Sequence, residues 1–489
     1  MPKRFLVTTA IDYVNGEPHL GHALEKVEAD AFSRFLRMEG YEVKFLSGTD
    51  ENSLKNVQAA QKAGVSVKEW VDKYYTYFYE LKSLLNLSYD DFIRTTEERH
   101  KKGVIKIWQS CQKDIYRQSY EGLYCVDCES FYEPKDLIDG LCPEHKKPLE
   151  KLKEENYFFR LSRYQNELLK VIESGQFKIV PSYRANEILA FIKEGLEDIS
   201  ISRSSERARG WGIKVPNDPH QVIWVWFDAL TNYISAIGYG TDENEFEKWW
   251  GKESKVVHII GKGISRFHAI YWPAMLLAAG LRLPDTLFIH GYVTLSGEKM
   301  AKSGGSVIRP KDLVLKYGGE AVRYYLLRAI SAYQDSDFSE EALKERYNHE
   351  LASGLGNLTS RILALAEGLE ISLKENIFEK EIKDILARYR ELMFDFRFNE
   401  ALNEAWNLIG LADAYLSKTR LWEKTEKEKI EGLSSLIFVL YHLARLLLPF
   451  LPETSSRILK YLGLEDSKPE DLTHLKLKLK KEPPLFPRL

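Results

Sequence analysis

The chain has 489 residues, of which 44% are hydrophobic and 29% charged, and its formal net charge is −3. At about 100 to 200 residues per domain, this length predicts roughly three folding units rather than one core. The composition argues against a disordered or membrane protein, and the near-neutral charge argues against a general nucleic-acid coat.

The start of the chain passes directly into a β-branched, apolar segment and shows no signal-peptide pattern. We therefore expect a cytoplasmic protein that makes no contact with a membrane. Four cysteines are too few for a disulfide framework, and three of them lie between residues 125 and 142. In a reducing compartment such a cluster favours a metal site.

Strands and helices alternate at the start of the chain. Residues 5–14 (FLVTTAIDYV) predict a buried strand, and residues 22–41 predict an amphipathic helix that ends at Gly40. A strand at 43–48 and a helix at 53–64 follow. This order is typical of a doubly wound parallel sheet of the Rossmann type.

The alternation is interrupted between about residues 116 and 220 by short strands, turn residues and the cysteines. It returns with a strand at 255–261, a helix at 266–280 and a strand at 286–295. We interpret the interruption as an insertion between two halves of one nucleotide-binding fold. After about residue 340 only helical patterns follow, which predicts a helical bundle with a basic, proline-rich tail.

Two histidines flank a glycine in NGEPHLGHAL (15–24), where the first strand turns into the first helix. Ligands of open α/β sheets bind at such turns. His19 and His22, three residues apart, lie on one side of the helix and can donate hydrogen bonds to phosphate oxygens, while Gly21 leaves room for a base or a ribose. The alternative is a pair of turn histidines that only cap the helix.

A second signal lies in HGYVTLSGEKMAKSGGSV (290–307), which places Lys299 and Lys302 in a glycine- and serine-rich loop. Two such cations suit a polyphosphate. Alone they would be a solvated charge run, but they follow the returning strand and so match the histidines at the edge of the other half-sheet.

The segment 122–145 has the pattern C-x2-C-x13-C-x2-H, with ligands Cys125, Cys128, Cys142 and His145. Four soft or borderline ligands in two close pairs predict one tetrahedral, structural zinc ion with no open position for catalysis. The remaining Cys111 lies on an amphipathic helix, and we expect it to be a packed thiol.

HLGH (19–22) and KMAKS (299–303) resemble the two signatures of class I aminoacyl-tRNA synthetases. Further segments look like the methionyl-tRNA synthetase family within that class: SGTDEN (47–52), VWFDALTNYI (225–234), HIIGKG (258–263), FHAIYWPAMLLAAG (267–280) and GNLTSR (356–361). The resemblance covers essentially the whole chain.

The resemblance implies that methionine attacks the α-phosphate of ATP, giving methionyl-adenylate and pyrophosphate, and that the methionyl group then passes to tRNA(Met). The implied catalytic residues are His19, His22, Lys299 and Lys302, and Mg²⁺ would arrive with ATP. The implied ATP-binding residues are His19, Gly21, His22, Gly291 and Lys302.

By the same resemblance, Asp50 pairs with the methionine ammonium. The implied pocket is lined by Ala10, Ile11, Tyr13, Asp50, Trp226, Ala229, Leu230, Tyr233, His268 and Trp272. An aromatic pocket suits a thioether, which gains about 0.3–1.5 kcal/mol per sulfur–aromatic contact. For Trp226 and Trp272 the alternative is a plain core role. The insertion is too small for a second, hydrolytic domain, so we expect discrimination in the synthetic site.

In the helical region the resemblance implies that Asn357, Arg361 and Trp422 read the anticodon, by base-edge hydrogen bonds and by stacking. The alternative for Asn357 and Arg361 is packing between helices. We expect a monomer. The expected segments are 1–115 and 223–298 for the halves of the catalytic domain, 116–222 for the insertion, 299–345 for the lysine loop and stem-contact region, and 346–489 for the anticodon-binding domain and tail.

Three positions depart from the pattern of the family. Ala301 stands where serine is usual, Gly263 where an acid is usual, and Asn52 lies in DENS, which replaces the common D-E-H-G. Three alternatives stay open: a small nucleotidyltransferase, which would lack the knuckle and the helical tail, a class I synthetase for another amino acid, and a catalytically impaired paralogue that binds tRNA.

Overall fold

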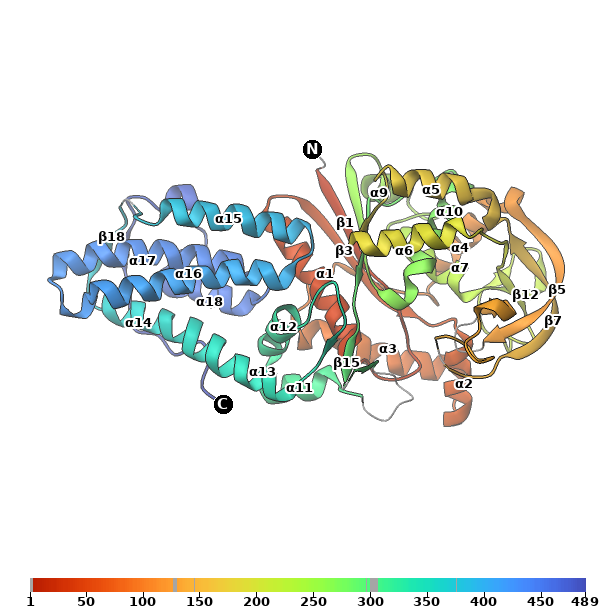
Figure 1. The fold of residues 1–489 in the computed structure, drawn as a ribbon, viewed down its shortest axis with the longest axis horizontal. Coiled ribbons are helices and arrows are strands. Elements are labelled where there is room, and N and C mark those ends of the chain that lie inside the picture. Colours follow the sequence, from red (N-terminus) through yellow and green to blue (C-terminus); the bar gives the residue numbers. More distant parts are fainter. Residues whose placement is uncertain (1–2, 126–129, 145, 296, 300–306, 375) are drawn as a thin grey trace. The chain divides into compact units, whose positions relative to one another are not determined.

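The structure, a computed structural model, describes residues 3–125, 130–144, 146–295, 297–299, 307–374 and 376–489. The chain divides into two compact units (Figure 1). The first comprises Met1–Pro18, Gly40–Lys82 and Tyr89–His290, and the second comprises His19–Glu39, Ser83–Ser88 and Gly291–Leu489. Helix α1 (Leu20–Met38) therefore belongs to the second unit, although the strands before and after it belong to the first.

A parallel sheet forms the centre of the first unit. Among the described residues it has seven strands in the order β2, β3, β1, β13, β14, β8, with β4 also paired to β3. All of these pairs are parallel. The strands are β1 (Arg4–Thr9), β2 (Asp12–Tyr13), β3 (Glu42–Asp50), β4 (Asp91–Arg94), β8 (Lys178–Val180), β13 (Ser254–Gly261) and β14 (Thr286–His290).

The predicted Rossmann-type parallel sheet is confirmed. Strand β1 lies between β3 and β13, so the strand order reverses on either side of it. In open α/β sheets ligands bind beyond the carboxyl ends of the strands at such a reversal. The fold thus places the candidate site after β1, β3 and β13.

Two predicted strands are divided in the structure. Residues 5–14 form β1 and β2, and residues 286–295 form β14 and β15 (Val293–Leu295). The second break includes Gly291, where an added Cβ would lie 2.3 Å from the backbone of Gln334. Only glycine allows this approach, which explains why the chain leaves the parallel sheet there.

Helices of the first unit contribute to a large apolar core with strands β1, β3, β13 and β14. They are α4 (Glu98–Ser110), α5 (Gln165–Glu173), α6 (Ser182–Lys193), α7 (Val225–Leu230), α8 (Asn232–Ser235), α9 (Glu243–Trp250), a π-helical turn (Phe267–Tyr271) and α10 (Trp272–Ala278). Helix α2 (Leu54–Ala63) is not part of this core, and α3 (Val67–Leu84) contributes Val71 and Phe78 to a separate, smaller cluster.

The predicted insertion contains two small antiparallel sheets, with strand orders β6-β5-β7-β9 and β10-β12-β11. Its strands are β5 (Ile115–Cys125), β6 (Ser130–Tyr132), β7 (Glu150–Phe159), β9 (Ile199–Ser200), β10 (Ser202–Ser204), β11 (Lys214–Val215) and β12 (Asp218–Ile223). Between them, β8 pairs in parallel with β14. The chain therefore returns to the main sheet within the range 116–222.

The second unit is mainly helical, and α15 to α18 pack against one another in it (Figure 1). Its helices are α1, α11 (Pro310–Tyr317), α12 (Gly319–Arg328), α13 (Glu340–Arg346), a π-helical segment (Tyr347–Gly356), α14 (Asn357–Ala366), α15 (Glu379–Phe394), α16 (Phe398–Thr419), α17 (Glu426–Leu447) and α18 (Pro452–Leu462). Short strands are β15, β16 (Glu298–Lys299), β17 (Ser336–Asp337), β18 (Glu370–Ser372) and β19 (Lys476–Lys478).

Helix α17 is long and apolar enough to cross a membrane, by length and composition alone. However, 78% of its apolar window is buried within the protein. A helix that is apolar on all sides is expected at the centre of a bundle, and α17 lies in that position against α14, α16 and α18.

Candidate active site

The residues predicted to line the amino-acid pocket all belong to the first unit. They come from the segment after β1 (Ala10, Ile11, Tyr13), the end of β3 (Asp50), helices α7 and α8 (Trp226, Ala229, Leu230, Tyr233), and the turn into α10 (His268, Trp272). Seven of them belong to one apolar cluster or pack against it: Ala10, Ile11, Tyr13, Trp226, Leu230, Tyr233 and Trp272.

The two tryptophans of this set have different surroundings. Trp226 is half-buried, lies flat on Phe267 with 3.7 Å between ring centroids, and meets Tyr13 edge-on. Its indole N–H is buried and has no hydrogen-bond partner among the described residues. Trp272 is fully buried and donates to His258 Nε2 at 3.2 Å. A plain core role therefore fits Trp272. It does not account for Trp226, whose indole N–H has no acceptor among the described residues.

Two buried histidines form hydrogen bonds with aromatic residues of this set, His268 with Tyr233 and His258 with Trp272. His268 Nδ1 lies 2.9 Å from the Ile264 carbonyl, which only accepts, so Nδ1 carries a proton, and Nε2 lies 2.6 Å from the Tyr233 hydroxyl. His258 Nε2 accepts from Trp272, so in the neutral ring Nδ1 donates to Thr8 Oγ1 at 2.7 Å. Burial, with His268 nearby, holds the pKa of His258 well below its usual range. His258 is therefore uncharged at neutral pH.

Asp50 lies at the carboxyl end of β3, and it is 3% exposed. Its Oδ1 accepts from the backbone N–H of Asn52 at 3.3 Å, and its carbonyl accepts from Asn56 at 3.0 Å. The side chain of Asn52 donates to the Thr95 carbonyl and, at 2.8 Å, to Asp228 Oδ2. Asn52, whose purpose the sequence does not reveal, thus joins Asp50 to helix α7.

The next residue, Glu51, anchors the same loop. Its carboxylate is fully buried, and Arg94 donates to both oxygens, at 2.6 and 3.1 Å. Thr49 also donates to this carboxylate, and the Trp211 indole donates to the Glu51 carbonyl at 2.8 Å. A bidentate pair within such a network fixes geometry. The backbone that carries Asp50 is therefore held rigidly.

The predicted phosphate-binding histidines lie in the second unit, at the start of α1. His19 is the N-cap residue, and its Nδ1 accepts from the N–H of Gly21 at 3.1 Å. His22 Nδ1 accepts from the N–H of His19 at 3.0 Å, and the two rings stack with centroids 3.8 Å apart. Because both Nδ1 atoms are acceptors, each neutral ring carries its proton on Nε2. Capping and phosphate donation are therefore compatible, since they use different ring nitrogens.

The lysine signature is described only in part. Lys299 ends the short strand β16, where its backbone pairs with Thr294 of β15, and Lys302 and Ala301 lie outside the described residues. Asp337 fixes the turn before the loop by accepting from the Gly297 N–H at 2.9 Å and from the Thr294 hydroxyl. The structure thus shows how the loop begins. Gly263, the departure after β13, lies exposed in a single helical turn.

Of the predicted zinc ligands, the structure describes Cys125 at the end of β5 and Cys142, and both are 1% exposed. Cys128 and His145 lie outside the described residues. Among the described residues no group of three or more possible metal ligands is found. Cys111 is fully buried, its Sγ lies 3.5 Å from the Met275 carbonyl, and burial raises its pKa, as expected for a packed thiol.

The predicted anticodon residues belong to the second unit. Asn357 is exposed at the start of α14, and Arg361, one turn later, donates to Asp413 of α16 at 3.1 Å. Trp422 lies in a short turn after α16 and is 44% exposed. The packing alternative therefore holds in part for Arg361, while Asn357 and Trp422 face solvent.

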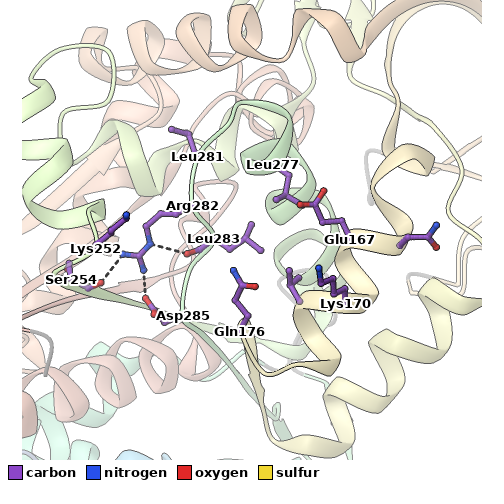
Figure 2. Close-up of a pocket in the computed structure, with 12 residues that line it drawn as sticks. Glu167, Lys170, Gln176, Lys252, Ser254, Leu277, Leu281, Arg282, Leu283 and Asp285 are labelled. Carbon is purple, nitrogen blue, oxygen red and sulfur yellow. Dashed lines mark hydrogen bonds and ion pairs between the residues drawn. The ribbon is translucent and has the colours of Figure 1, made fainter.

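A cavity of about 740 Å³ in the first unit is lined by none of the predicted site residues, and Figure 2 shows the residues that do line it. Its lining includes Lys252 and Ser254 at the start of β13 and Asp285 just before β14. It is therefore at the amino ends of the parallel strands, opposite the candidate site. Arg282 crosses its wall and donates to the Ser254 carbonyl and to Asp285. These contacts tie strand ends together and indicate a structural role for the wall.

Sequence reasoning did not single out three buried polar residues of the first unit, His100, Asp228 and His258. A signal was present for two of them. A lone acid interrupts the apolar segment VWFDAL, and a lone histidine interrupts VVHIIG. A charged or polar residue enclosed in an apolar run needs a buried partner, and that need marks it for attention.

The profile of the family described as "tRNA synthetases class I (M)" matches residues 5–151 and 145–363. The profile described as "Anticodon-binding domain of tRNA ligase" matches residues 375–483. A methionine–tRNA ligase from Fusobacterium nucleatum is 40% identical, over 100% of this chain and 80% of its own length. One from Caldanaerobacter subterraneus is 43% identical, over 100% of this chain and 79% of its own length.

Among solved structures, the fold is similar to methionyl-tRNA synthetase of Mycobacterium tuberculosis in complex with methionyl-adenylate. The TM-score is 0.90 at 36% sequence identity, and the match covers 99% of this chain and 100% of that one.

Proposed function

The chain belongs to the class I tRNA synthetases of the methionine type, and from this premise we propose how its residues divide the work. It is a methionine–tRNA ligase. Methionine and ATP give methionyl-adenylate and pyrophosphate, and the methionyl group then passes to the 3′-terminal ribose of tRNA(Met). Neither step needs a covalent intermediate with the enzyme, so the protein contributes position and charge.

In this proposal His19 and His22 donate hydrogen bonds from Nε2 to the phosphates of ATP. The capping contacts support it, because they occupy both Nδ1 atoms and hold the rings side by side. The helix N-terminus adds a field that favours an anion. Lys299 and Lys302 would stabilise the charge that builds on the departing pyrophosphate, and Mg²⁺ would bind with the phosphate oxygens.

Asp50 is proposed to pair with the methionine ammonium. Its low exposure and its rigid loop support this role, because a fixed, desolvated carboxylate binds a cation more strongly than a mobile, hydrated one. Tyr13, Trp226 and His268 would surround the thioether. The hydrogen bonds of His268 to the Tyr233 hydroxyl and the Ile264 carbonyl fix the orientation of its ring.

For the tRNA, Trp422 is proposed to stack on an anticodon base and Asn357 to bond a base edge, with Arg361 beside it. Trp422 supports the assignment by its place in the part of the chain that matches the anticodon-binding profile, whereas Asn357 and Arg361 lie at the end of the part that matches the synthetase profile. Exposed aromatic rings on a rigid turn suit unstacked loop bases. A monomeric state and a cytoplasmic location stay predictions.

One structural zinc ion is also proposed, held by Cys125, Cys128, Cys142 and His145. The support is chemical, since Cys125 and Cys142 are buried cysteines and thiolates are preferred zinc ligands. Four protein ligands would fill the coordination shell, so the ion would stabilise the insertion. Elemental analysis of protein purified without chelator should find one zinc per chain, and its absence would contradict the proposal.

The observation that carries the function is the full-length similarity to methionine–tRNA ligases at about 40% identity. Its test is ATP–pyrophosphate exchange with each of the twenty amino acids in turn, without tRNA. We expect exchange with methionine alone. Exchange with a different amino acid would indicate another specificity, and no exchange with any would indicate a catalytically impaired paralogue.

A further inference from the structure

A fully buried carboxylate on helix α7 is bound at both oxygens. His100 Nε2, on α4, lies 2.6 Å from Asp228 Oδ1, and the Asn52 amide donates to Oδ2 at 2.8 Å. His100 and Asp228 are both 0% exposed. Three segments far apart in sequence therefore meet on one side chain.

The hydrogen bonds define how His100 is held. A carboxylate only accepts, so His100 Nε2 carries a proton. The Ser235 hydroxyl on α8 lies 2.8 Å from His100 Nδ1 and 3.3 Å from the Asn232 carbonyl. The Ser235 hydroxyl donates to that carbonyl, and its oxygen also contacts His100 Nδ1. A chain of hydrogen bonds thus joins Ser235, His100 and Asp228.

The packing of α4 against α8 restricts how far these hydrogen-bonded side chains can move. At Gly103, one turn after His100, an added Cβ would lie 2.6 Å from the Ser235 Cβ. Glycine therefore lets α4 and α8 approach until the hydrogen bonds are short. The hydrogen-bond network extends to Asp50 through Asn52. The side-chain amide of Asn52 donates to Asp228, and its backbone N–H donates to Asp50.

We propose that Ser235 and His100 are positioning residues for methionine, acting through Asp228 and Asn52 on Asp50. The inference rests on the proposed role of Asp50. Helix α7 also carries Trp226, so the same carboxylate sets the distance between the ammonium partner and the aromatic wall. A buried polar network gains little net stability over an apolar core, but it fixes geometry.

The experiment compares Ser235→Ala, His100→Gln and His100→Ala with Ser254→Ala as a matched control. Ser254, labelled in Figure 2, is another buried serine of the first unit. Its hydroxyl has no hydrogen-bond partner among the described residues. The kcat and the KM values for methionine and ATP come from pyrophosphate exchange. Binding of methionine and of 4-(methylthio)butanoate, which lacks the ammonium, is measured by calorimetry.

We expect the methionine KM to rise about 2- to 10-fold in Ser235→Ala and about 10- to 100-fold in His100→Ala, with the ATP KM unchanged. His100→Gln keeps a donor to Asp228 and should recover most of the loss. Binding of methionine should weaken while binding of the butanoate does not. Ser254→Ala should behave as wild type.

Equal losses for both ligands, or equal effects of the two serine variants, would overturn the positioning role even if wild type is active. If the wild type shows no methionine-dependent exchange, the proposed function is wrong, and so is the positioning role of Ser235 and His100. Should His100→Ala fail to fold by circular dichroism, Ser235→Ala and His100→Gln still decide the question.

Discussion

The absence of a Cβ at Gly21 leaves room for the ring of His19, one of the two histidines proposed to bind phosphate. An added Cβ would lie 2.9 Å from His19 Cε1 and 3.0 Å from Nδ1, so alanine must displace the ring that caps α1. Alanine also favours a helix by about 0.8–1 kcal/mol. Gly21→Ala should therefore keep the thermal midpoint while methionine-dependent exchange falls about 100-fold, because a displacement near 1 Å can cost that much.

The control is Gly410→Ala in α16, where an added Cβ meets nothing within 4 Å. It should raise the midpoint slightly and leave exchange unchanged. Exchange at wild-type rates in Gly21→Ala would show that the position of the His19 ring does not matter to catalysis.

The spacing of His19 and His22 predicts their shared side of the helix, since three residues make nearly one turn. No spacing in the sequence predicts the contacts of Asn52, because its partners Thr95 and Asp228 come from remote parts of the chain. Trp226 and Trp272 likewise look alike in sequence. Only packing separates the half-buried ring from the enclosed one.

Helices α1 and α12 are joined by a buried ion pair, Asp30 with Arg323, at 2.7 Å, and both side chains are 0% exposed. Arg323 also donates to the carbonyls of Leu85, Pro449 and Phe450. Removing one partner leaves the other charge buried alone. We expect Arg323→Met to lower the free energy of unfolding of the second unit by about 3–5 kcal/mol, measured by urea denaturation.

The exposed pair of Arg388 with Glu404 provides the control, and Arg388→Met should cost less than about 1 kcal/mol.

The stability of the second unit should also depend on pH through Asp30. Burial alone would raise its pKa, but Arg323, Arg34 and Ser88 hold the pKa below its usual value. A lowered pKa stabilises the fold above the unfolded value of about 3.9, and this stability is lost as the pH falls through the folded value. If the free energy of unfolding of the wild type does not decrease when the pH is lowered below about 4, this account is contradicted.

Elements with strong periodicity were predictable, as the helix at α1 and the strands β1, β3 and β13 show. Strand β8 was not, because KIV is too short to give a pattern and pairs with β14 over a hundred residues later. The break at Gly291 was hidden for a related reason. The close approach that requires glycine there comes from the remote residue Gln334.

For the molecule as a whole, sequence patterns indicated a parallel-sheet part and a helical part, and each is present. They did not indicate that α1 would belong with the helical unit. Periodicity shows which face of a helix is apolar, but it does not show which partner covers that face. In α1 that partner includes α12, whose Arg323 forms an ion pair with the buried Asp30.

The two reaction steps should respond separately to a change at Trp422, because adenylate formation needs no tRNA. Stacking of a base on an aromatic side chain is worth about 1–3 kcal/mol, so Trp422→Ala should lower kcat/KM for tRNA(Met) about 5- to 150-fold in aminoacylation. Pyrophosphate exchange and the thermal midpoint should not change, since the side chain is 44% exposed. Trp422→Phe keeps an aromatic face and should recover most of the loss. If exchange falls together with aminoacylation, the side chain supports the fold of the second unit and the anticodon role is wrong.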